Sequence, residues 1–254
     1  MFFYFLYKCK KYTTSIDKCN YNTYNDNGGY MRVNNKLYEK QGIHVISAIF
    51  TVDNGVTKVL LIKRSNEPYK DMWALLGGAL YNNERLEDGL RREIYEKSGI
   101  TDCDIYQFKC FDEFEDKNNE YRMIAVSYLG ILNNKTNINS INKNTLDAKW
   151  FDIDNIPKLA FKHGIILEEA LEKLKSLIVQ SDILKSILKD EFTMPELQNV
   201  FESIFKKKFD RRNFRKKILS LDIIDDLNKS ISINGNKPSK LYKFKDEIPV
   251  KKLF

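Results

Sequence analysis

Acidic side chains and glycines recur between Gly78 and Ile100 at a spacing that suits metal and phosphate chemistry. The spaced residues are, in order, Gly78, Glu84, Arg92, Glu93, Glu96, Lys97 and Gly99. On a helix, positions 93, 96 and 97 stand at i, i+3 and i+4, so their side chains share one face. Carboxylates at all three positions would hold Mg²⁺ or Mn²⁺ against a diphosphate. Gly78 would let the backbone approach a ligand closely, and Arg92 can brace Glu84 or Glu93 in a charge-assisted pair.

This pattern resembles the Nudix box, G-x5-E-x7-R-E-U-x-E-E-x-G-U, in which U is a bulky apolar residue. Eight of its nine fixed positions match this sequence. An ordinary acidic amphipathic helix would not account for Gly78, Arg92 and Gly99 together. The resemblance implies an α/β fold, the Nudix α/β/α sandwich with a mixed sheet.

The sequence departs from the box at Lys97, which stands where the family has its second consecutive glutamate. An ammonium group has no lone pair for a metal, and it places a positive charge where a cation would sit. Leu76 also replaces the proline of the family's Leu-Pro-Gly-Gly segment. We therefore predict a damaged catalytic site and assign no catalytic residue; any remaining activity would be that of a Nudix hydrolase weakened by Lys97. Glu93 and Glu96 are vestigial and are doubtful metal ligands, no cofactor is required, and only residual hydrolysis would need Mg²⁺ or Mn²⁺.

We also predict that Lys97 acts as a built-in cation that binds the diphosphate of a ligand without cleaving it.

A second feature is the basic segment 206–217. It holds eight lysines and arginines and one acid, Asp210, so its net charge of +7 equals that of the whole chain. Such a focus of positive charge is typical of nucleic-acid binding, although a solvated helix face would carry it too.

Hydrophobic periodicity predicts the elements that position both features. Strands are expected around Ile43–Val52, Lys58–Lys63, Asp104–Phe111, Met123–Leu132 and Ala148–Phe151, with a hairpin turn at Asp53-Asn54-Gly55. Leu86–Ser98 and residues 164–179 have the apolar spacing of helices, and Asn133–Asn144 is expected to be a surface loop.

The sequence of the last 65 residues predicts two helices followed by a hairpin, which is the order of a winged helix-turn-helix. Thr193 and Glu196 form a capping box for a helix that ends near Phe205, and Asp210 caps a second helix that ends near Leu221. Two extended segments follow, Ile231–Ile233 and Leu241–Lys245, with a turn at residues 234–236.

On the second helix, ~100° per residue places Phe214, Ile218 and Leu221 on a buried stripe. The residues directed away from this stripe suit the edges of bases and the phosphates of a major groove, and two lysines of the wing suit phosphate or the minor groove. The predicted DNA-binding residues are Arg211, Arg212, Asn213, Arg215, Lys216, Lys237 and Lys240.

Together the two parts resemble the NrtR family, bacterial transcription regulators in which a Nudix-like domain is fused to a C-terminal winged helix. The segments that carry the resemblance are Leu61–Arg64, Trp73–Leu75, the Nudix-like box, Lys149–Asp152, Leu159–His163, Phe192–Leu197, Asp210–Arg215, Gly235–Pro238 and Leu241–Phe244. The implied organisation is an N-terminal extension (1–34), a Nudix-like ligand-binding domain (35–160), connecting helices (161–190) and a winged-helix DNA-binding domain (191–254).

The resemblance implies a homodimeric repressor of NAD-metabolism or sugar-utilisation genes. It would bind a double-stranded DNA operator and respond to ADP-ribose or a related nucleotide or sugar. The ligand-binding residues it implies are Arg64, Trp73, Gly78, Glu84, Arg92, Glu93, Glu96 and Lys97. His163 also matches a family position, and we expect it to be a structural histidine at the domain junction. The helix at 164–190, which joins the domains, would transmit the response.

Other features limit the class of protein. The chain has no apolar run of ~20 residues and its four cysteines lack C-x-x-C spacing, which predicts a cytoplasmic protein without a membrane span or disulfide scaffold. The 34-residue extension has no sustained period. We expect it to be either disordered or an artefact of start-codon assignment, and the second case predicts Met31 as the start.

Two alternatives to a regulator stay open. One is an active Nudix pyrophosphohydrolase that acts on ADP-ribose-like nucleoside diphosphates with Glu84, Glu93 and Glu96 around one metal. The other is an RNA-binding or assembly module, which would need exposed aromatic side chains for base stacking.

Overall fold

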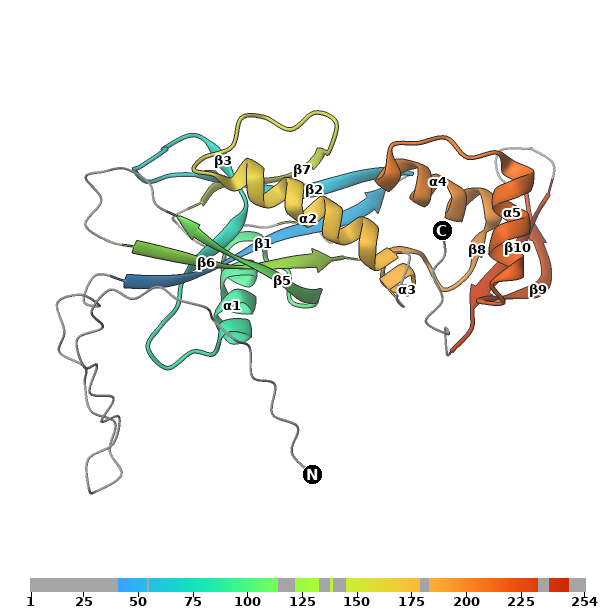
Figure 1. Ribbon diagram of the computed structural model, residues 1–254, viewed down its shortest axis with the longest axis horizontal. Helices are drawn as coiled ribbons and strands as arrows, with labels where there is room; N and C mark the ends of the chain where they lie inside the picture. The colour runs from blue at the N-terminus through green and yellow to red at the C-terminus, as the bar shows by residue number, and fades with distance from the viewer. Residues whose placement is uncertain are drawn as a thin grey trace, which may run out of the picture. The chain divides into compact units, whose positions relative to one another are not determined.

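A seven-stranded mixed sheet forms the body of the molecule (Figure 1). Its strands are β1 (Gln41–Asp53), β2 (Val56–Arg64), β3 (Trp73–Ala74), β4 (Leu76–Ala79), β5 (Asp104–Glu113), β6 (Arg122–Ile131) and β7 (Thr145–Asp152). The order is β3-β2-β1-β6-β5, with β4 paired to β1 and β7 paired to β2. The β1–β6 pair is parallel and the other pairs are antiparallel. This confirms the predicted Nudix architecture.

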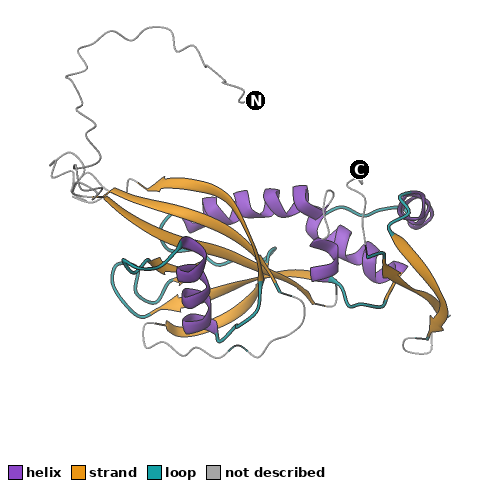
Figure 2. Ribbon diagram, turned by 90° about the horizontal axis from the view of Figure 1, so that it is seen from below, coloured by secondary structure: helices purple, strands orange, loops and turns teal. Residues whose placement is uncertain are grey.

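Helices cover both faces of the sheet: α1 (Leu86–Ser98) lies on one face and α2 (His163–Ile178) on the other (Figure 2). Alternation along a strand sends successive side chains to opposite faces. In β2, Leu60 and Ile62 therefore pack in the cluster that contains the apolar residues of α1, whereas Val59 and Leu61 pack in the cluster that contains those of α2. The helix predicted over Leu86–Ser98 is confirmed at both ends.

The C-terminal elements have the winged-helix order. They are α3 (Ile183–Ile187), β8 (Phe192–Thr193), α4 (Met194–Phe205), α5 (Arg211–Ser220), β9 (Ile224–Ile231) and β10 (Ser239–Phe244). The three strands form a second sheet in the order β8-β10-β9. The capping box at Thr193 is present, and Asp210 accepts a hydrogen bond from the backbone N–H of Asn213. Both predicted caps are confirmed.

The strand predicted at Ile231–Ile233 is placed wrongly, because β9 begins at Ile224 and ends at Ile231. Ile223 and Ile224 are buried and anchor the strand, and Ile224 pairs with Phe244. The polar residues that follow Ile224 lie on an edge strand. Their sequence therefore lacks the alternation of apolar and polar residues that predicts a half-buried strand. The two-residue strand β8 was not predicted either.

The Nudix-like sheet and the winged helix share one hydrophobic core. A single cluster of buried residues runs from Ile46 in β1 through α2 and α3 to Phe244 in β10. At the junction the hydroxyl of Ser203 in α4 lies 2.6 Å from both the backbone nitrogen and the hydroxyl of Thr57 in β2. Lys206 also forms an ion pair with Asp154. The winged helix therefore contacts the end of β2 directly, in addition to its covalent connection through α2 and α3.

The computed structural model describes residues 41–53, 55–113, 122–132, 138, 145–178, 183–232 and 238–246. Within these residues no helix is both long enough and apolar enough to cross a membrane. The predictions for the extension at 1–34, for Asn54, for nearly all of the Asn133–Asn144 loop, and for the turn at 234–236 with Lys237 fall outside the described residues.

Candidate functional site

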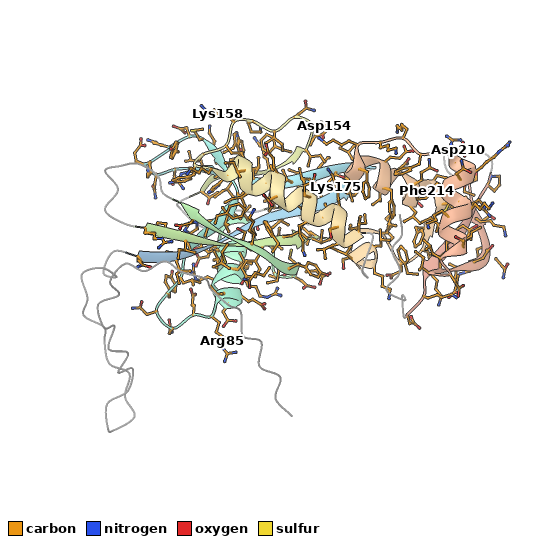
Figure 3. The ribbon with its side chains drawn as sticks, viewed as in Figure 1. Arg85, Asp154, Lys158, Lys175, Asp210 and Phe214 are labelled. Carbon is orange, nitrogen blue, oxygen red and sulfur yellow. The ribbon has the colours of Figure 1, made fainter. Side chains whose placement is uncertain are left out.

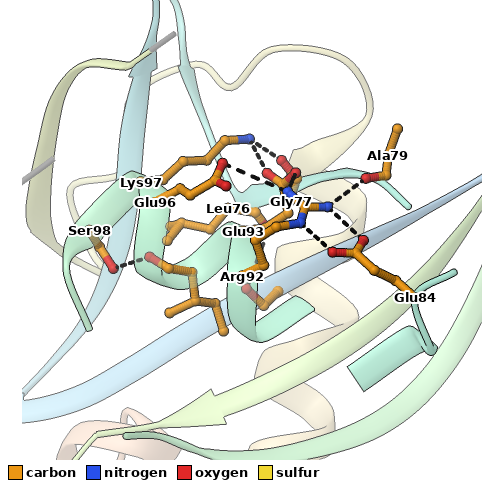
Figure 4. Close-up of polar contacts among 11 residues, drawn as sticks. Leu76, Gly77, Ala79, Glu84, Arg92, Glu93, Glu96, Lys97 and Ser98 are labelled. Atoms are coloured by element: carbon orange, nitrogen blue, oxygen red, sulfur yellow. Dashed lines mark hydrogen bonds and ion pairs between the residues drawn. The ribbon is translucent and has the colours of Figure 1, made fainter. Parts of the chain in front are cut away.

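Arg92 is the centre of the polar network on α1 (Figure 4). Its Nε and Nη2 donate to the two carboxylate oxygens of Glu84 at 2.6 and 2.9 Å, and Nη2 also donates to the carbonyl of Ala79. The guanidinium lies 4.0 Å from the ring centroid of Tyr81, whose backbone N–H donates to Glu84. These contacts, the Arg92 hydrogen bonds first, lower the pKa of Glu84. Glu84 therefore fixes Arg92 and the turn before α1.

Glu93 is buried, and both of its carboxylate oxygens have cationic partners. Oε1 accepts a hydrogen bond from Nη1 of Arg92 at 2.7 Å, and Oε2 lies 2.9 Å from Nζ of Lys97. Lys97 also donates to the carbonyl of Gly77. Glu96 is more exposed and lies 3.7 Å from Arg92. The face predicted to be shared by positions 93, 96 and 97 exists, and on it Lys97 neutralises Glu93.

Two glycines of the box are required by geometry. A Cβ atom on Gly78 would lie 2.3 Å from the Glu93 carboxylate, so any side chain there would displace the carboxylate. Gly99 ends α1 with a φ of +75°, which favours glycine. The sequence predicts that the backbone at Gly78 approaches a ligand closely. Gly78 lies in strand β4, and the close approach in the structure is that of Glu93.

Two adjoining cavities lie beside this network. The first, of about 320 Å³, is mainly apolar and includes His44, Met123, Phe161 and His163 in its lining. The second, of about 260 Å³, is charged and is lined by Arg64, Asn66, Tyr81, Arg92, Glu93, Glu96 and Lys97 with Ile62 and Gly78. The residues that line both cavities are Ile62, Arg64, Gly78 and Lys97. A ligand with one apolar part and one anionic part would fit this arrangement.

The structure brings together most of the predicted ligand-binding residues. Arg64, Gly78, Arg92, Glu93, Glu96 and Lys97 line the described cavities. Glu84 acts behind them as the partner of Arg92. Trp73 is not among the residues that line either cavity: its ring packs edge-to-face on Phe151 at 4.6 Å.

The residues of the apolar cavity that the sequence did not single out come from separate elements. Phe161 precedes α2, and its ring packs against His163 and under the guanidinium of Arg64 at 4.8 Å. His44 comes from β1 and Met123 from β6. The signal in the sequence that could have identified Phe161 is the Leu159–His163 segment, which carries part of the family resemblance.

His163 is a structural histidine, but it lies in the cavity wall and not at the domain junction. It is the first residue of α2, and its Nδ1 accepts a hydrogen bond from the backbone N–H of Leu75 at 3.0 Å. Burial is the main cause that lowers its pKa to about 3. Burial also lowers the pKa of His44. Both imidazoles are therefore neutral at pH 7, and the first cavity has no charge from them.

The second surface is the exposed face of α5 (Figure 3). Phe214, Ile218 and Leu221 are buried, as the stripe predicted. The predicted DNA-binding residues of α5 are all exposed; they are Arg211, Arg212, Asn213, Arg215 and Lys216. In the wing, Tyr242 and Phe244 are buried while Lys243 is exposed between them, and Lys240 forms an ion pair with Asp226 at 2.6 Å. The aromatic side chains of this part thus support its fold and are not exposed for base stacking.

Comparison with known proteins identifies a family for each of the two parts of the chain. The family model of the NrtR DNA-binding winged helix domain matches residues 185–244. The family model of the NUDIX domain matches residues 42–173, which is more than half of the chain. The chain is an NrtR-type member of the Nudix family. The ADPR responsive transcriptional repressor NtrR of Acinetobacter baylyi is 29% identical to this NrtR-type chain over 78% of the chain and 79% of that protein. The ADP-ribose pyrophosphatase of Methanocaldococcus jannaschii is 32% identical over 49% of this chain and 70% of that protein.

Solved structures agree with this assignment. Shewanella oneidensis NrtR in complex with a 27mer DNA has a TM-score of 0.64 and 26% identity, over 80% of this chain and 93% of that chain. The NUDIX domain of the same NrtR in complex with ADP ribose has a TM-score of 0.50 and 27% identity, over 55% of this chain and 92% of that chain.

Proposed function

We propose that this NrtR-type protein is a DNA-binding transcription regulator, a repressor of NAD-metabolism or sugar-utilisation genes that responds to a nucleotide ligand. The observation that carries the proposal is α5, which presents five polar and basic side chains to the exterior above a buried apolar stripe. Arg212, Asn213 and Lys216 match the hydrogen-bonding patterns of guanine, adenine and phosphate respectively. The Acinetobacter repressor and the Shewanella DNA complex support the same function.

The active form would be a homodimer on double-stranded DNA. A two-fold dimer presents two recognition helices to half-sites separated by about one helical turn or a multiple of it, which requires an approximately palindromic operator. Such a protein acts in the cytoplasm, where an operator is accessible.

ADP-ribose or a related nucleoside diphosphate is the ligand that the cavities fit best. The mainly apolar cavity with the neutral side chains of His44 and His163 would take a base or ribose. The neighbouring cavity would take the diphosphate, at the side where Arg64 and Lys97 line both cavities. Arginine and lysine are the side chains that bind phosphate oxygens most strongly. A sugar derivative would accept hydrogen bonds from the same arginine and lysine side chains but would carry fewer negative charges.

A divalent metal does not fit the box as it stands in this sequence. Both Glu93 oxygens already accept from cationic side chains, and Lys97 holds a positive charge where a third carboxylate would coordinate the ion. We therefore propose that the ligand is bound and released without efficient hydrolysis. In that role Lys97 supplies, as a fixed side chain, positive charge that metal ions supply in hydrolases of this type.

An active pyrophosphohydrolase is the second candidate, favoured by the retained Glu84, Glu93 and Glu96 and by the likeness to the Methanocaldococcus enzyme. Release of AMP from ADP-ribose with Mg²⁺ or Mn²⁺ separates the two candidates. A regulator would give release near the background rate.

The deciding experiment measures binding to the chain's own upstream DNA and to NAD-biosynthesis promoters at two salt concentrations, with and without ADP-ribose. We expect tight, sequence-selective binding that ADP-ribose weakens. Selective binding that ADP-ribose does not change would keep the regulator and direct the search to sugars. Weak binding that is equal on all sequences and lost with salt would refute the regulator.

A further inference from the structure

A cavity of about 730 Å³ opens on the winged helix between the start of α4, the start of α5 and β10. Arg211 and Arg215 line it from α5, and Lys240 and Tyr242 line it from the wing. It is separate from the two cavities of the Nudix fold, and it is large enough to take a phosphate together with its sugar.

The buried hydroxyl of Tyr242 points to a ligand in this cavity. Tyr242 is 1% exposed, and its hydroxyl has no hydrogen-bond partner among the residues that the structure describes. A buried hydroxyl without a partner loses its hydrogen bonds to water and forms none within the protein. It is therefore destabilising unless a ligand forms a hydrogen bond with it. The Arg215 guanidinium lies 5.9 Å from the centroid of the same ring, so a cation lies over the ring that carries the unpartnered hydroxyl.

The charge of the lining favours an anion. The lining holds Lys208, Arg211, Arg215 and Lys240 and one acid, Glu202, while Lys240 forms an ion pair with Asp226. Glu202 is already satisfied, because it accepts from Lys208 Nζ at 2.6 Å, Gln198 Nε2 at 2.8 Å and Phe209 N at 2.9 Å. It therefore braces the turn between α4 and α5 and leaves the arginines available for an anion.

We propose that this cavity seats one phosphate of the DNA backbone beside the recognition helix, with the Tyr242 hydroxyl and the Arg215 guanidinium as its donors. The inference rests on the proposed function, because it assumes that α5 enters a groove. A phosphate fixed between α5 and the wing would set how deeply and at what angle the helix enters. It would contribute equally on every sequence, since backbone contacts position a protein and do not read bases.

The test compares Tyr242→Phe in the full chain with the unchanged protein on an operator duplex and on an unrelated duplex. We expect affinity to fall about ten-fold on both, because a hydrogen bond to a charged group is lost. The dependence of affinity on salt should keep its slope, since the hydroxyl carries no charge, whereas Arg215→Gln should reduce the slope by about one. The unbound Tyr242→Phe protein should be at least as stable as the unchanged chain, because an unpartnered buried hydroxyl has been removed.

The matched control is Tyr95→Phe, an exposed tyrosine on α1, which should change none of these quantities. Equal DNA affinity of Tyr242→Phe and the unchanged chain would overturn the inference and leave the proposed function intact. A loss confined to the operator would also overturn it, since the hydroxyl would then read a base. A destabilised free variant would show that the hydroxyl serves the fold. If the unchanged chain fails to bind any duplex, the proposed function itself has failed.

Discussion

Replacing Lys97 by glutamate should give the Nudix-like box a dependence on Mg²⁺ that we expect to be absent with Lys97. Lys97 is 14% exposed and Glu93 is 9% exposed, and the two lie one helical turn apart in an ion pair of 2.9 Å. The variant Lys97→Glu replaces this attraction by repulsion between two carboxylates. Breaking a fully buried ion pair costs about 3–5 kcal/mol, and Glu93 keeps Arg92 as a partner, so we expect a loss of about 2 kcal/mol in the free energy of unfolding.

Mg²⁺ should reverse this loss in the variant. The new carboxylate would stand with Glu93 and Glu96 on one face, which completes the set of oxygen ligands that the ion prefers. A ligand that is present at 100 times its Kd stabilises the folded state by about 2.7 kcal/mol. For a fold of this size, each kcal/mol shifts the melting temperature by about 2–4 °C. The variant should therefore melt about 4–8 °C lower than the unchanged chain without Mg²⁺, and recover a comparable amount with it.

The assay is thermal unfolding with and without Mg²⁺, combined with AMP release from ADP-ribose. Lys97→Gln is the matched control, because it loses the ammonium group and gains no carboxylate. The unchanged chain and this control should show no specific Mg²⁺ shift and little AMP release, whereas Lys97→Glu should gain both. An equal Mg²⁺ response in Lys97→Glu and Lys97→Gln would refute the reasoning, because Glu93 and Glu96 would then not be placed to share a metal.

Three further predictions concern pH, coupling and DNA specificity. The pKa of His163 falls from its ordinary value of about 6.5 to about 3 on folding, so the unfolded chain binds the proton first. Stability should therefore be constant above about pH 7 and decline by about 1.4 kcal/mol per pH unit below 6.5. Urea unfolding at pH 7.5 and 5.5 should show a smaller decline in His163→Gln, with the remainder due to His44, and an equal decline would contradict this. Ser203→Ala removes the hydrogen bonds to Thr57, so ADP-ribose should change DNA affinity by a smaller factor while affinity without the ligand is kept. If ADP-ribose changes the DNA affinity of Ser203→Ala by the same factor as in the unchanged chain, the contact of Ser203 with Thr57 does not transmit the response. Arg212→Ala should lower operator affinity and relax discrimination at one base pair by about 1–3 kcal/mol, which competition with single-substituted operators would measure. A uniform loss on all sequences would assign Arg212 to phosphate.

The sequence was most informative where the structural signal is local. The capping residues Thr193 and Asp210 define the starts of α4 and α5, because each satisfies backbone N–H groups of its own first turn. Apolar spacing likewise predicts α1 at both ends, and the spacing of the box predicts that Arg92 pairs with Glu84 or Glu93; in the structure it contacts both.

Features that depend on distant pairing were not predictable from the sequence. The apolar cavity joins His44, Met123 and Phe161, which lie far apart in the chain. Parallel pairing of β1 with β6 brings His44 near Met123, and the bridge of Leu159 to Trp73 holds the segment that carries Phe161. The resemblance implies that Trp73 is a ligand-binding residue. In the structure its ring packs on Phe151 of β7, which pairs with β2, and Trp73 lines neither of the two described cavities. The contact of Ser203 with Thr57 likewise arises from tertiary packing and has no counterpart in any sequence pattern.

The junction suggests why β2 matters for a ligand-dependent regulator. One end of this strand, at Ile62 and Arg64, lines both ligand cavities, and the other end contacts α4 through Thr57. A ligand can shift the winged helix only by as much as its affinity differs between the two arrangements, and a stiff strand that touches both sites gives that difference a physical origin. The shift lasts only while the ligand stays intact. A box that hydrolysed its ligand would remove the signal that the winged helix reads, so the Lys97–Glu93 pair and the β2–α4 contact serve the same proposed response.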